Sequence, residues 1–403
     1  MPDELLSDVK VLDLTHYIAG PYCTKLFADY GADVIKIERP GTGDPARQLS
    51  PFFKDEPHPE KSGLFLHLNT NKRSITLNLK TDTGQEIFKE LVKEADIVVE
   101  NFRPGVMANF GLDFPVLKGI KPDLVMTSIS NFGQNGPYRD YKASELILYG
   151  MGGEMYSVGV PERHPLKQGG NVVQYEAGAA AAAATMGVLF SSRLQGIGQH
   201  VDVSIMETQL AGVDRRHATL LAYQYCGDIQ PRIAGWMPGY PSGAIPCADG
   251  YVEIAAGAAL WDRVVKMLGE PEFLKDPKWT TPTAQTDPAL KEEFETFFIP
   301  WMMERTKAEV WQAGQAARVF CGPLFTSEDL LHDQHFNERG FWEEIEHPET
   351  GKVKYPGRPF KLSNAPTPPR RPAPSLGQHN EEVFSDLGYS SEELVKLRDR
   401  GVI

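Results

Sequence analysis

Residues 9–39 read Val-Lys-Val-Leu-Asp-Leu-Thr-His-Tyr-Ile-Ala-Gly-Pro-Tyr-Cys-Thr-Lys-Leu-Phe-Ala-Asp-Tyr-Gly-Ala-Asp-Val-Ile-Lys-Ile-Glu-Arg. Apolar and polar side chains alternate over residues 9–15 and again over residues 32–39, and this alternation predicts two β-strands. Residues 22–30, between them, predict a helix that Gly31 ends. A strand, a helix and a second strand in this order predict parallel strands joined by a crossover. No Gly-x-Gly-x-x-Gly motif follows the first strand, so the pattern does not support a nicotinamide dinucleotide site.

Further strands and helices alternate along the chain to about residue 226. Strands are predicted at residues 74–80, 96–102, 123–130 and 199–205. Helices are predicted from a capping box of Thr83 and Glu86 to about residue 95, from Gly178 to about residue 194, and from residue 206 to about 226. This alternation predicts an α/β fold with a doubly wound sheet. Ligands of such sheets bind beyond the carboxyl ends of the strands, which here carry His16, Arg39 and residues 101–103.

A smaller domain is predicted after residue 226. Residues 227–246 are rich in glycine and proline, which is typical of a linker. A strand at residues 251–255, a helix at 260–268 and two helices within 288–317 then predict a small α+β domain, so that linker and small domain together occupy residues 227–325. The second of those two helices opens with a capping box of Thr306 and Glu309. A hairpin at residues 341–355 and an extended proline-rich segment at 365–374 follow.

The bulk properties limit the classes of protein to which the chain can belong. Its formal net charge is −13, with 54 acidic against 41 basic residues in 403, which argues against nucleic acid as the main partner. The four cysteines are scattered without paired spacing, so neither a disulfide framework nor a metal site is expected. The amino terminus does not resemble a signal peptide, and the longest apolar stretch, residues 177–190, is too short to span a bilayer. We therefore expect a cytoplasmic protein.

Residues 166–190 are the stretch in which chemistry is expected. They read Leu-Lys-Gln-Gly-Gly-Asn-Val-Val-Gln-Tyr-Glu-Ala-Gly and continue as an alanine-rich run to Phe190. Gly178 opens a segment of strong helix formers. The polar residues before it, Gln174 to Glu176, therefore have backbone N–H donors and the positive end of a helix nearby.

Several separated segments together resemble the family III CoA-transferases, the formyl-CoA transferase and carnitine CoA-transferase type. Each is a weak signal alone, but they occur in the family's order and spacing over nearly the whole chain: residues 16–22, 31–40, 71–80, 98–105, 198–204 and 401–403. The resemblance implies a Rossmann-like large domain built from residues 1–226 and 326–403, with the small domain between. It also implies that two subunits interlock, with CoA lying between the large domain of one and the small domain of the other.

The resemblance also implies which residues bind CoA. CoA carries phosphates and an adenine, so its site needs cations, N–H donors and flat apolar contacts. CoA and acyl-CoA are expected as substrates, with no tightly bound cofactor. Surface solvation explains Lys72 and Arg73 equally well, whereas Arg39 is held at a strand end. The candidates by matching position are His16, Ala19, Arg39, Lys72, Arg73, Asn101, Phe102, Arg103 and Lys142.

In the family, an aspartate stands four residues before the glycine that corresponds to Gly178, and here that position is Gln174. The aspartate of the family attacks the thioester of acyl-CoA and forms a mixed anhydride. The released CoA thiolate then attacks this anhydride, and CoA becomes bound to the carboxyl group of the enzyme. A neutral amide cannot do this, and losing a covalent route raises the barrier steeply. Glu176 would point to the same side in an extended segment, but not in a helix. Glu145 matches an acidic position of the family that lies near the thioester.

Three functions follow from this exchange. Some family members are hetero-oligomers in which one of two homologous subunits lacks the aspartate, as in the benzylsuccinate CoA-transferases, and we expect this chain to be such a non-nucleophilic subunit with a pseudo-active site. A homodimeric acyl-CoA racemase is the second possibility, although racemising relatives use the same aspartate with a histidine. The third is a non-catalytic CoA-binding protein.

Overall fold

The structure, a computed structural model, describes residues 4–212, 214–229, 231–232, 239–363 and 370–403. The described residues form two compact units. The first takes in those of residues 1–158, 166–230 and 340–403, and the second those of 159–165 and 231–339. The first unit therefore contains both ends of the chain. The sequence placed the two domain boundaries at residues 226 and 325.

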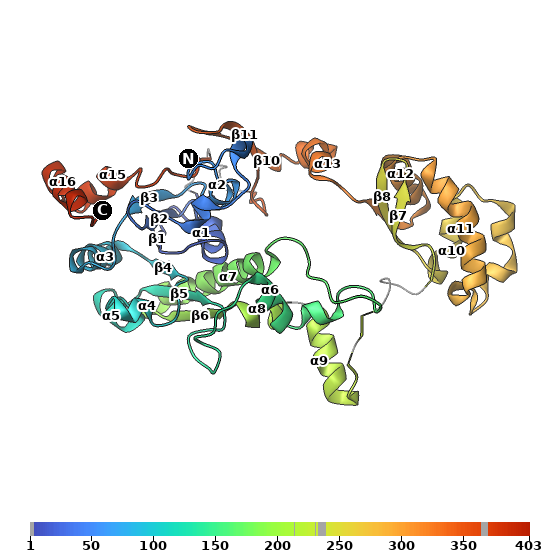
Figure 1. Cartoon of the computed structure of the whole chain (residues 1–403), viewed down its shortest axis with the longest axis horizontal. Helices are drawn as coiled ribbons and strands as arrows, with labels where there is room; N and C mark the ends of the chain where they lie inside the picture. Colours follow the sequence, from blue (N-terminus) through green and yellow to red (C-terminus); the bar gives the residue numbers. More distant parts are fainter. Residues whose placement is uncertain (1–3, 213, 230, 233–238, 364–369) are drawn as a thin grey trace. The chain divides into compact units, whose positions relative to one another are not determined.

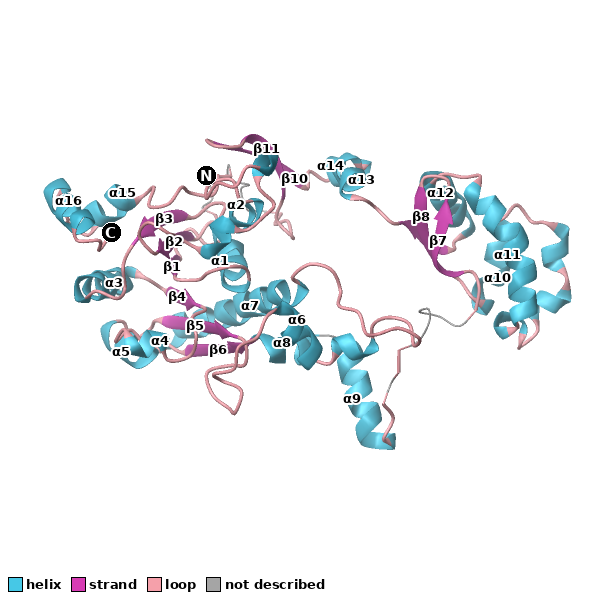
Figure 2. Cartoon of the chain, viewed as in Figure 1, coloured by secondary structure: helices cyan, strands magenta, loops and turns pink. Residues whose placement is uncertain are grey.

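A six-stranded sheet forms the centre of the first unit, in the order β3-β2-β1-β4-β5-β6 (Figures 1 and 2). All neighbouring strands are parallel. The predicted doubly wound α/β fold is thus confirmed, and each strand predicted in this sheet is present but shorter, with β3 beginning one residue earlier than predicted. The strands are β1 (Lys10–Asp13), β2 (Asp33–Glu38), β3 (Arg73–Thr76), β4 (Ile97–Glu100), β5 (Val125–Ser130) and β6 (His200–Ser204).

Helices cover both faces of this sheet because each carries apolar residues at helical spacing. In α3 (Asp82–Glu94), for example, Ile87, Phe88, Leu91 and Val92 are buried on one side. One face packs against α1 (Ala19–Asp29), α6 (Glu145–Met151) and α7 (Val172–Gln195). The other packs against α3, α5 (Phe114–Ile120), α15 (Asn380–Asp386) and α16 (Ser391–Asp399).

Several helices begin at residues other than those predicted, among them α1, which begins at Ala19 and not at residue 22. Thr81, not Thr83, is the N-cap of α3, because its hydroxyl accepts a hydrogen bond from the N–H of Gly84 at 3.1 Å. The helix α7 begins six residues before Gly178, directly after a turn at Gly170, which has φ +76°. The polar residues expected before the helix are therefore inside its first two turns.

The remaining elements of the first unit lie around this frame. They are α2 (Gly63–Leu68), α4 (Val106–Asn109), α8 (Ile205–Gly212), α9 (Asp214–Cys226) and the hairpin β10 (Trp342–His347) with β11 (Gly351–Pro356). The predicted hairpin is confirmed. Residue 213, inside the long helix predicted over 206–226, and residues 364–369, inside the predicted proline-rich segment, lie outside the described residues.

The second unit is a small α+β body. Its antiparallel sheet consists of β7 (Ser242–Cys247), β8 (Gly250–Ala255) and β9 (Phe320–Pro323). It is packed with α10 (Trp261–Met267), α11 (Pro288–Met303) and α12 (Lys307–Ala317), and α13 (Ser327–His332) and α14 (Gln334–Glu338) follow. The capping box of Thr306 and Glu309 is present as predicted. No helix among the described residues is long and apolar enough to cross a membrane.

Candidate active site

The order of the strands reverses between β1 and β4, and this is the point at which open α/β sheets bind ligands. His16 follows β1 and Asn101 follows β4. The N–H of His16 donates to Oδ1 of Asn101, and Nδ2 of Asn101 donates to the carbonyl of His16, both at 2.8 Å. These two bonds join the loops at the carboxyl ends of both strands. The imidazole of His16 meets the ring of Phe102 edge-on, with centroids 5.5 Å apart.

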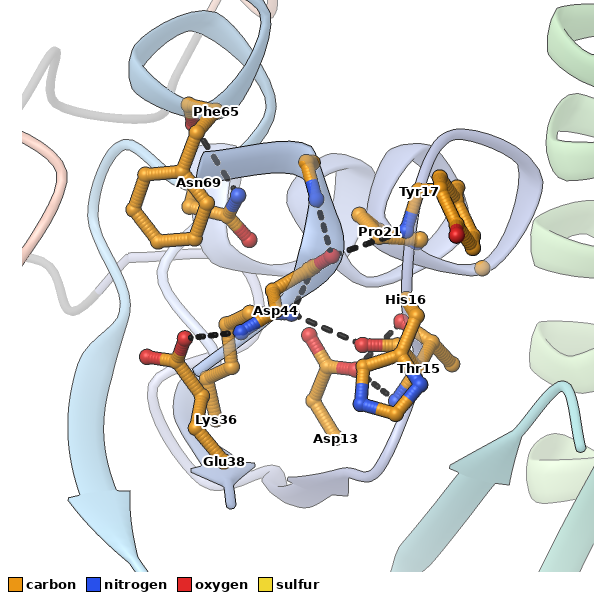
Figure 3. Close-up of polar contacts among 12 residues, drawn as sticks. Asp13, Thr15, His16, Tyr17, Pro21, Lys36, Glu38, Asp44, Phe65 and Asn69 are labelled. Carbon is orange, nitrogen blue, oxygen red and sulfur yellow. Dashed lines mark hydrogen bonds and ion pairs between the residues drawn. The ribbon is translucent and has the colours of Figure 1, made fainter. Parts of the chain in front are cut away.

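The buried side chains of Asp44 and Lys36 hold the loop of residues 15–17 in place (Figure 3). Oδ1 of Asp44 accepts from the N–H of Tyr17 at 3.1 Å, and its Oδ2 pairs with Nζ of Lys36 at 2.9 Å. Lys36 also donates to the carbonyl of Thr15 at 2.8 Å. Tyr17 has φ +66°, which is unusual for a residue with a side chain and persists only where the surroundings fix it. Burial and the nearby charge of Lys36 lower the pKa of His16, so its imidazole is neutral at pH 7.

A small pocket of about 70 Å³ opens at this edge of the sheet. Three of the predicted CoA-binding residues line it, namely His16, Arg39 and Phe102. Its other lining residues include Lys80 and Phe110, which the sequence analysis did not single out. Phe110 follows α4 and meets Phe102 edge-on at 6.5 Å. The sequence signals for Lys80 are its place as the last residue of the strand predicted at residues 74–80 and as the last residue of the family-like segment 71–80.

Exposed cations surround this pocket. Arg39 and Lys80 on its wall, and Arg103 beside Phe102, are exposed and form no ion pair with any residue that the structure describes. Cations without partners next to flat apolar rings match the needs of a ligand with phosphates and an aromatic base. The volume is small compared with typical ligand pockets, so it suits one part of a long ligand.

Lys72 and Arg73 do not lie at this pocket. Nζ of Lys72 is buried and hydrogen-bonded to Oδ2 of Asp13 at 2.9 Å, to Thr24 and Asn69 at 2.8 Å each, and to the carbonyl of Pro21 at 3.0 Å. An ammonium group has only three hydrogens, so none is left for a phosphate. Arg73 begins β3, so it lies at the amino end of a strand whose carboxyl end leads to the pocket, and it pairs with Asp33 and Glu382.

The first turns of α7 lie against the start of α1. A Cβ added at Gly178 would be 2.5 Å from the carbonyl oxygen of Ala19, so only glycine allows this approach. The ring of Tyr175 meets that of Tyr22 with centroids 4.8 Å apart. Ala19, predicted at the CoA site, is therefore buried at the contact that positions Gln174 one turn before Gly178.

Gln174 is the third residue of α7 and is half-buried. The amides of the first residues of a helix have no partner within the helix. One of them, the N–H of Val173, donates to Oε1 of Glu145 at 3.1 Å. The same oxygen lies 3.4 Å from Nζ of Lys167. Glu145 is thereby fixed as a cap on α7, and Lys142, three residues earlier, is exposed.

Glu176 points away from Gln174. Because α7 has already begun, Gln174 and Glu176, which are two positions apart, are separated by about 200° around the helix axis. Glu176 is half-buried, and burial, with the nearby charge of Glu154, raises the pKa of its carboxyl group. The extended geometry under which Glu176 would replace the missing aspartate is therefore wrong.

Comparisons with known proteins point to one family. The model of CoA-transferase family III matches residues 6–380. The chain is 36% identical over 414 residues to formyl-CoA:oxalate CoA-transferase of Streptomyces avermitilis, covering 99% of each chain. It is 34% identical over 406 residues to succinyl-CoA–D-citramalate CoA-transferase of Chloroflexus aurantiacus, covering 100% of this chain and 99% of the relative. A crystal structure of a CAIB/BAIF family protein from Brucella suis superposes with a TM-score of 0.85 at 28% identity, over 96% of this chain and 100% of the other.

Proposed function

The chain belongs to CoA-transferase family III, and from this premise we propose that it is the non-nucleophilic subunit of a hetero-oligomeric CoA-transferase. The enzyme would move CoA between an acyl-CoA thioester and a carboxylic acid. The reactive carboxylate would come from a homologous subunit. The named relatives exchange CoA between small carboxylic acids, which supports the same substrate class here.

The single observation that carries this proposal is Gln174 at the third position of α7. A carboxylate there would lie at the positive end of a helix, where negative charge is stabilised. The amide of glutamine is neutral and its nitrogen is delocalised. It offers no nucleophile that could take an acyl group from a thioester.

The neighbouring carboxylates do not replace it. Glu176 lies about 200° away around the helix. Oε1 of Glu145 accepts from the N–H of Val173, and its Oε2 is buried with no hydrogen-bond partner among the residues that the structure describes. An attacking carboxylate must reach the thioester, and a buried oxygen atom has no such access. The absence of an aspartate at position 174 also argues against an acyl-CoA racemase, because racemising relatives use that aspartate in their acid–base pair.

We propose that the CoA-binding part of the site is retained. Arg39, Lys80 and Arg103 would bind phosphates, and His16 and Phe102 would contact the adenine or the pantetheine arm. Asn101 would hold the loop that carries His16. Ala19 would set the approach of α7, and Lys142 would contact CoA from its exposed loop. Lys72 and Arg73 would have structural roles.

Exposed apolar side chains support an obligatory partner. Phe190 and Leu194 on α7 are 68% and 72% exposed, and Tyr225 at the end of α9 is 81% exposed. Monomeric proteins rarely leave many large apolar side chains on one body in water. We propose that a homologous subunit covers them in an interlocked dimer, with the small unit of this chain completing the partner's site. We propose a cytoplasmic location for this enzyme.

Reconstitution tests the proposal. The chain and any homologue that co-purifies with it from the source cell are purified separately and assayed for CoA transfer from succinyl-CoA, formyl-CoA and the acyl-CoA pool of that cell. We expect no transfer by this chain alone and transfer by the mixture. The matched control is the mixture in which the homologue's aspartate is changed to asparagine, which we expect to be inactive. Full transfer by this chain alone would overturn the proposal.

A further inference from the structure

Three polar side chains form a line beneath the predicted CoA-binding loop, one from each of three neighbouring strands. Glu100 is the last residue of β4 and is only 4% exposed. Ser128 lies opposite it on β5 and is 2% exposed. His200 opens β6 and is exposed. None of the three takes part in the site described above.

Hydrogen bonds connect the line from the surface to the loop. Oγ of Ser128 lies 2.8 Å from Nε2 of His200. The hydroxyl of Ser128 also acts on the carboxyl group of Glu100 as a hydrogen-bonding neighbour that lowers its pKa. Oε2 of Glu100 accepts from the N–H of Phe102 at 2.8 Å. A serine hydroxyl can accept from one neighbour while it donates to the other. The imidazole of His200 is fixed by stacking on Phe114, with centroids 5.6 Å apart.

The loop that Glu100 holds is the wall of the candidate CoA pocket. The ring of Phe102 lines that pocket, and Asn101, its neighbour, clamps both backbone groups of His16. A change in the bond between Glu100 and the N–H of Phe102 would therefore move two CoA-contacting groups at once.

We propose that Glu100 is a proton-linked positioning residue, which holds the CoA-binding loop when it is ionised and exchanges its proton with solvent through Ser128 and His200. This inference rests on the proposed binding of CoA at the pocket. In the exchange, the carboxyl proton passes to Oγ of Ser128 while the Ser128 hydroxyl hydrogen passes to Nε2 of His200. The imidazolium then releases the proton on Nδ1 to water, so the charges balance.

The surroundings of Glu100 place its titration in the physiological range. Burial raises its pKa to about 7, against the lowering effect of the bonds from Ser128 and Phe102, and Asp202 on β6 raises it further. On the same face, β1 contributes the uncharged Leu12 and Leu14, since Asp13 points to the opposite face. Among the described residues, the charged or titratable groups at the line are His200 itself and Asp202 on β6, and Lys118 of α5 lies over the ring of Phe114 on which His200 stacks.

The direction of the effect follows from the strength of one hydrogen bond. An ionised carboxylate accepts a stronger hydrogen bond from an N–H group than a neutral carboxylic acid does. Below pH 7 the hold on Phe102 weakens, and CoA should bind about five-fold less tightly than at pH 8. In Glu100→Gln, a neutral group of the same shape, the affinity should be that of the low-pH state at every pH.

The test is titration of the full-length chain with CoA by calorimetry between pH 6 and 8.5. We expect an inflection near pH 7 in the wild-type affinity and none beyond the ionisation of CoA itself in Glu100→Gln. In Ser128→Ala, the inflection should move to higher pH, because the bond that lowers the pKa of Glu100 is lost. A merely structural role of Glu100 would change the affinity without changing the shape of the pH profile.

Two outcomes would contradict the inference, and they can be told apart. Binding of CoA with the same pH profile in wild type and Glu100→Gln would overturn the role of Glu100 and leave the proposed function intact. No binding of CoA by any variant at any pH would overturn the CoA site itself, and this inference with it. Circular dichroism of each variant confirms that the fold is present in both cases.

Discussion

Lys72 and Arg39 were both predicted at the CoA site, but replacing each by methionine should affect two different properties. Lys72 is fully buried, and its ammonium pairs with Asp13. Arg39 is exposed at the pocket. We expect Lys72→Met to lower the free energy of unfolding and Arg39→Met to lower CoA affinity.

The size of the stability loss follows from what Lys72→Met leaves behind. Burial alone would raise the pKa of Asp13, but Lys72, Lys36 and two threonine hydroxyls outweigh it and hold this pKa well below its usual range. Without Lys72, a buried carboxylate keeps only part of its compensation. Removing one partner of a buried ion pair typically costs about 3–5 kcal/mol. That is a large fraction of the roughly 5–15 kcal/mol by which a typical protein is stable.

Chemical denaturation at pH 7 measures this effect, and a double-mutant cycle with Asp13→Asn isolates the pair. The double variant should lose less than the sum of the two single variants, because neither buried charge is then left alone. Arg39→Met should leave stability within about 0.5 kcal/mol of wild type and weaken CoA binding. Unchanged stability in Lys72→Met, together with a loss of CoA affinity like that of Arg39→Met, would refute the reasoning.

Three further predictions concern stability. The pKa of Glu100 is about 7 in the folded chain against an ordinary value of 4.5, so the folded chain binds this proton more tightly and loses stability as pH rises from 4.5 to 7. Glu100→Gln should therefore raise the free energy of unfolding by up to about 3 kcal/mol at pH 8 and by little at pH 4.5. An equal gain at both pH values would contradict this. Gly178→Ala, whose Cβ would meet Ala19, should cost about 1–3 kcal/mol in thermal unfolding, whereas Gly187→Ala on the same helix, with open space around it, should stabilise by up to about 1 kcal/mol; equal effects would sink the packing argument. Thr306→Ala should lower the stability of the small unit by about 1 kcal/mol, because the N-cap of α12 is lost. A loss below a few tenths of a kcal/mol would contradict this role of Thr306.

The frame of the fold could be predicted from the sequence because its strands carry alternating apolar and polar residues and follow one another with helices between them. The strand positions and the capping box at Thr306 followed from local patterns alone. The start of α7 did not. It depends on Glu145, which lies 28 residues before Val173 and accepts its N–H. A partner so far away in the chain cannot be predicted from the local sequence around the helix.

The candidate site was predictable in part for a related reason. Residues just after strand ends, such as His16, Arg39 and Phe102, meet at one edge in any parallel sheet. Lys72 precedes a strand, and its long side chain reaches under α1 to Asp13. Whether a lysine is buried or solvated depends on such tertiary partners. The line of Glu100, Ser128 and His200 was missed because its members are separated along the chain and become adjacent only through strand pairing.

Intact-protein mass spectrometry is the most direct test of the central claim that this chain carries no acyl-accepting carboxylate. The chain alone, its Gln174→Asp and Gln174→Asn variants, and the co-purified homologue are each incubated with the acyl-CoA that the reconstituted pair uses fastest, and covalent CoA esters are trapped. We predict an adduct on the homologue and on Gln174→Asp, and none on the wild-type chain or on Gln174→Asn. A CoA adduct on the wild-type chain alone, whether on Glu145, Glu176 or another carboxylate, would contradict the account.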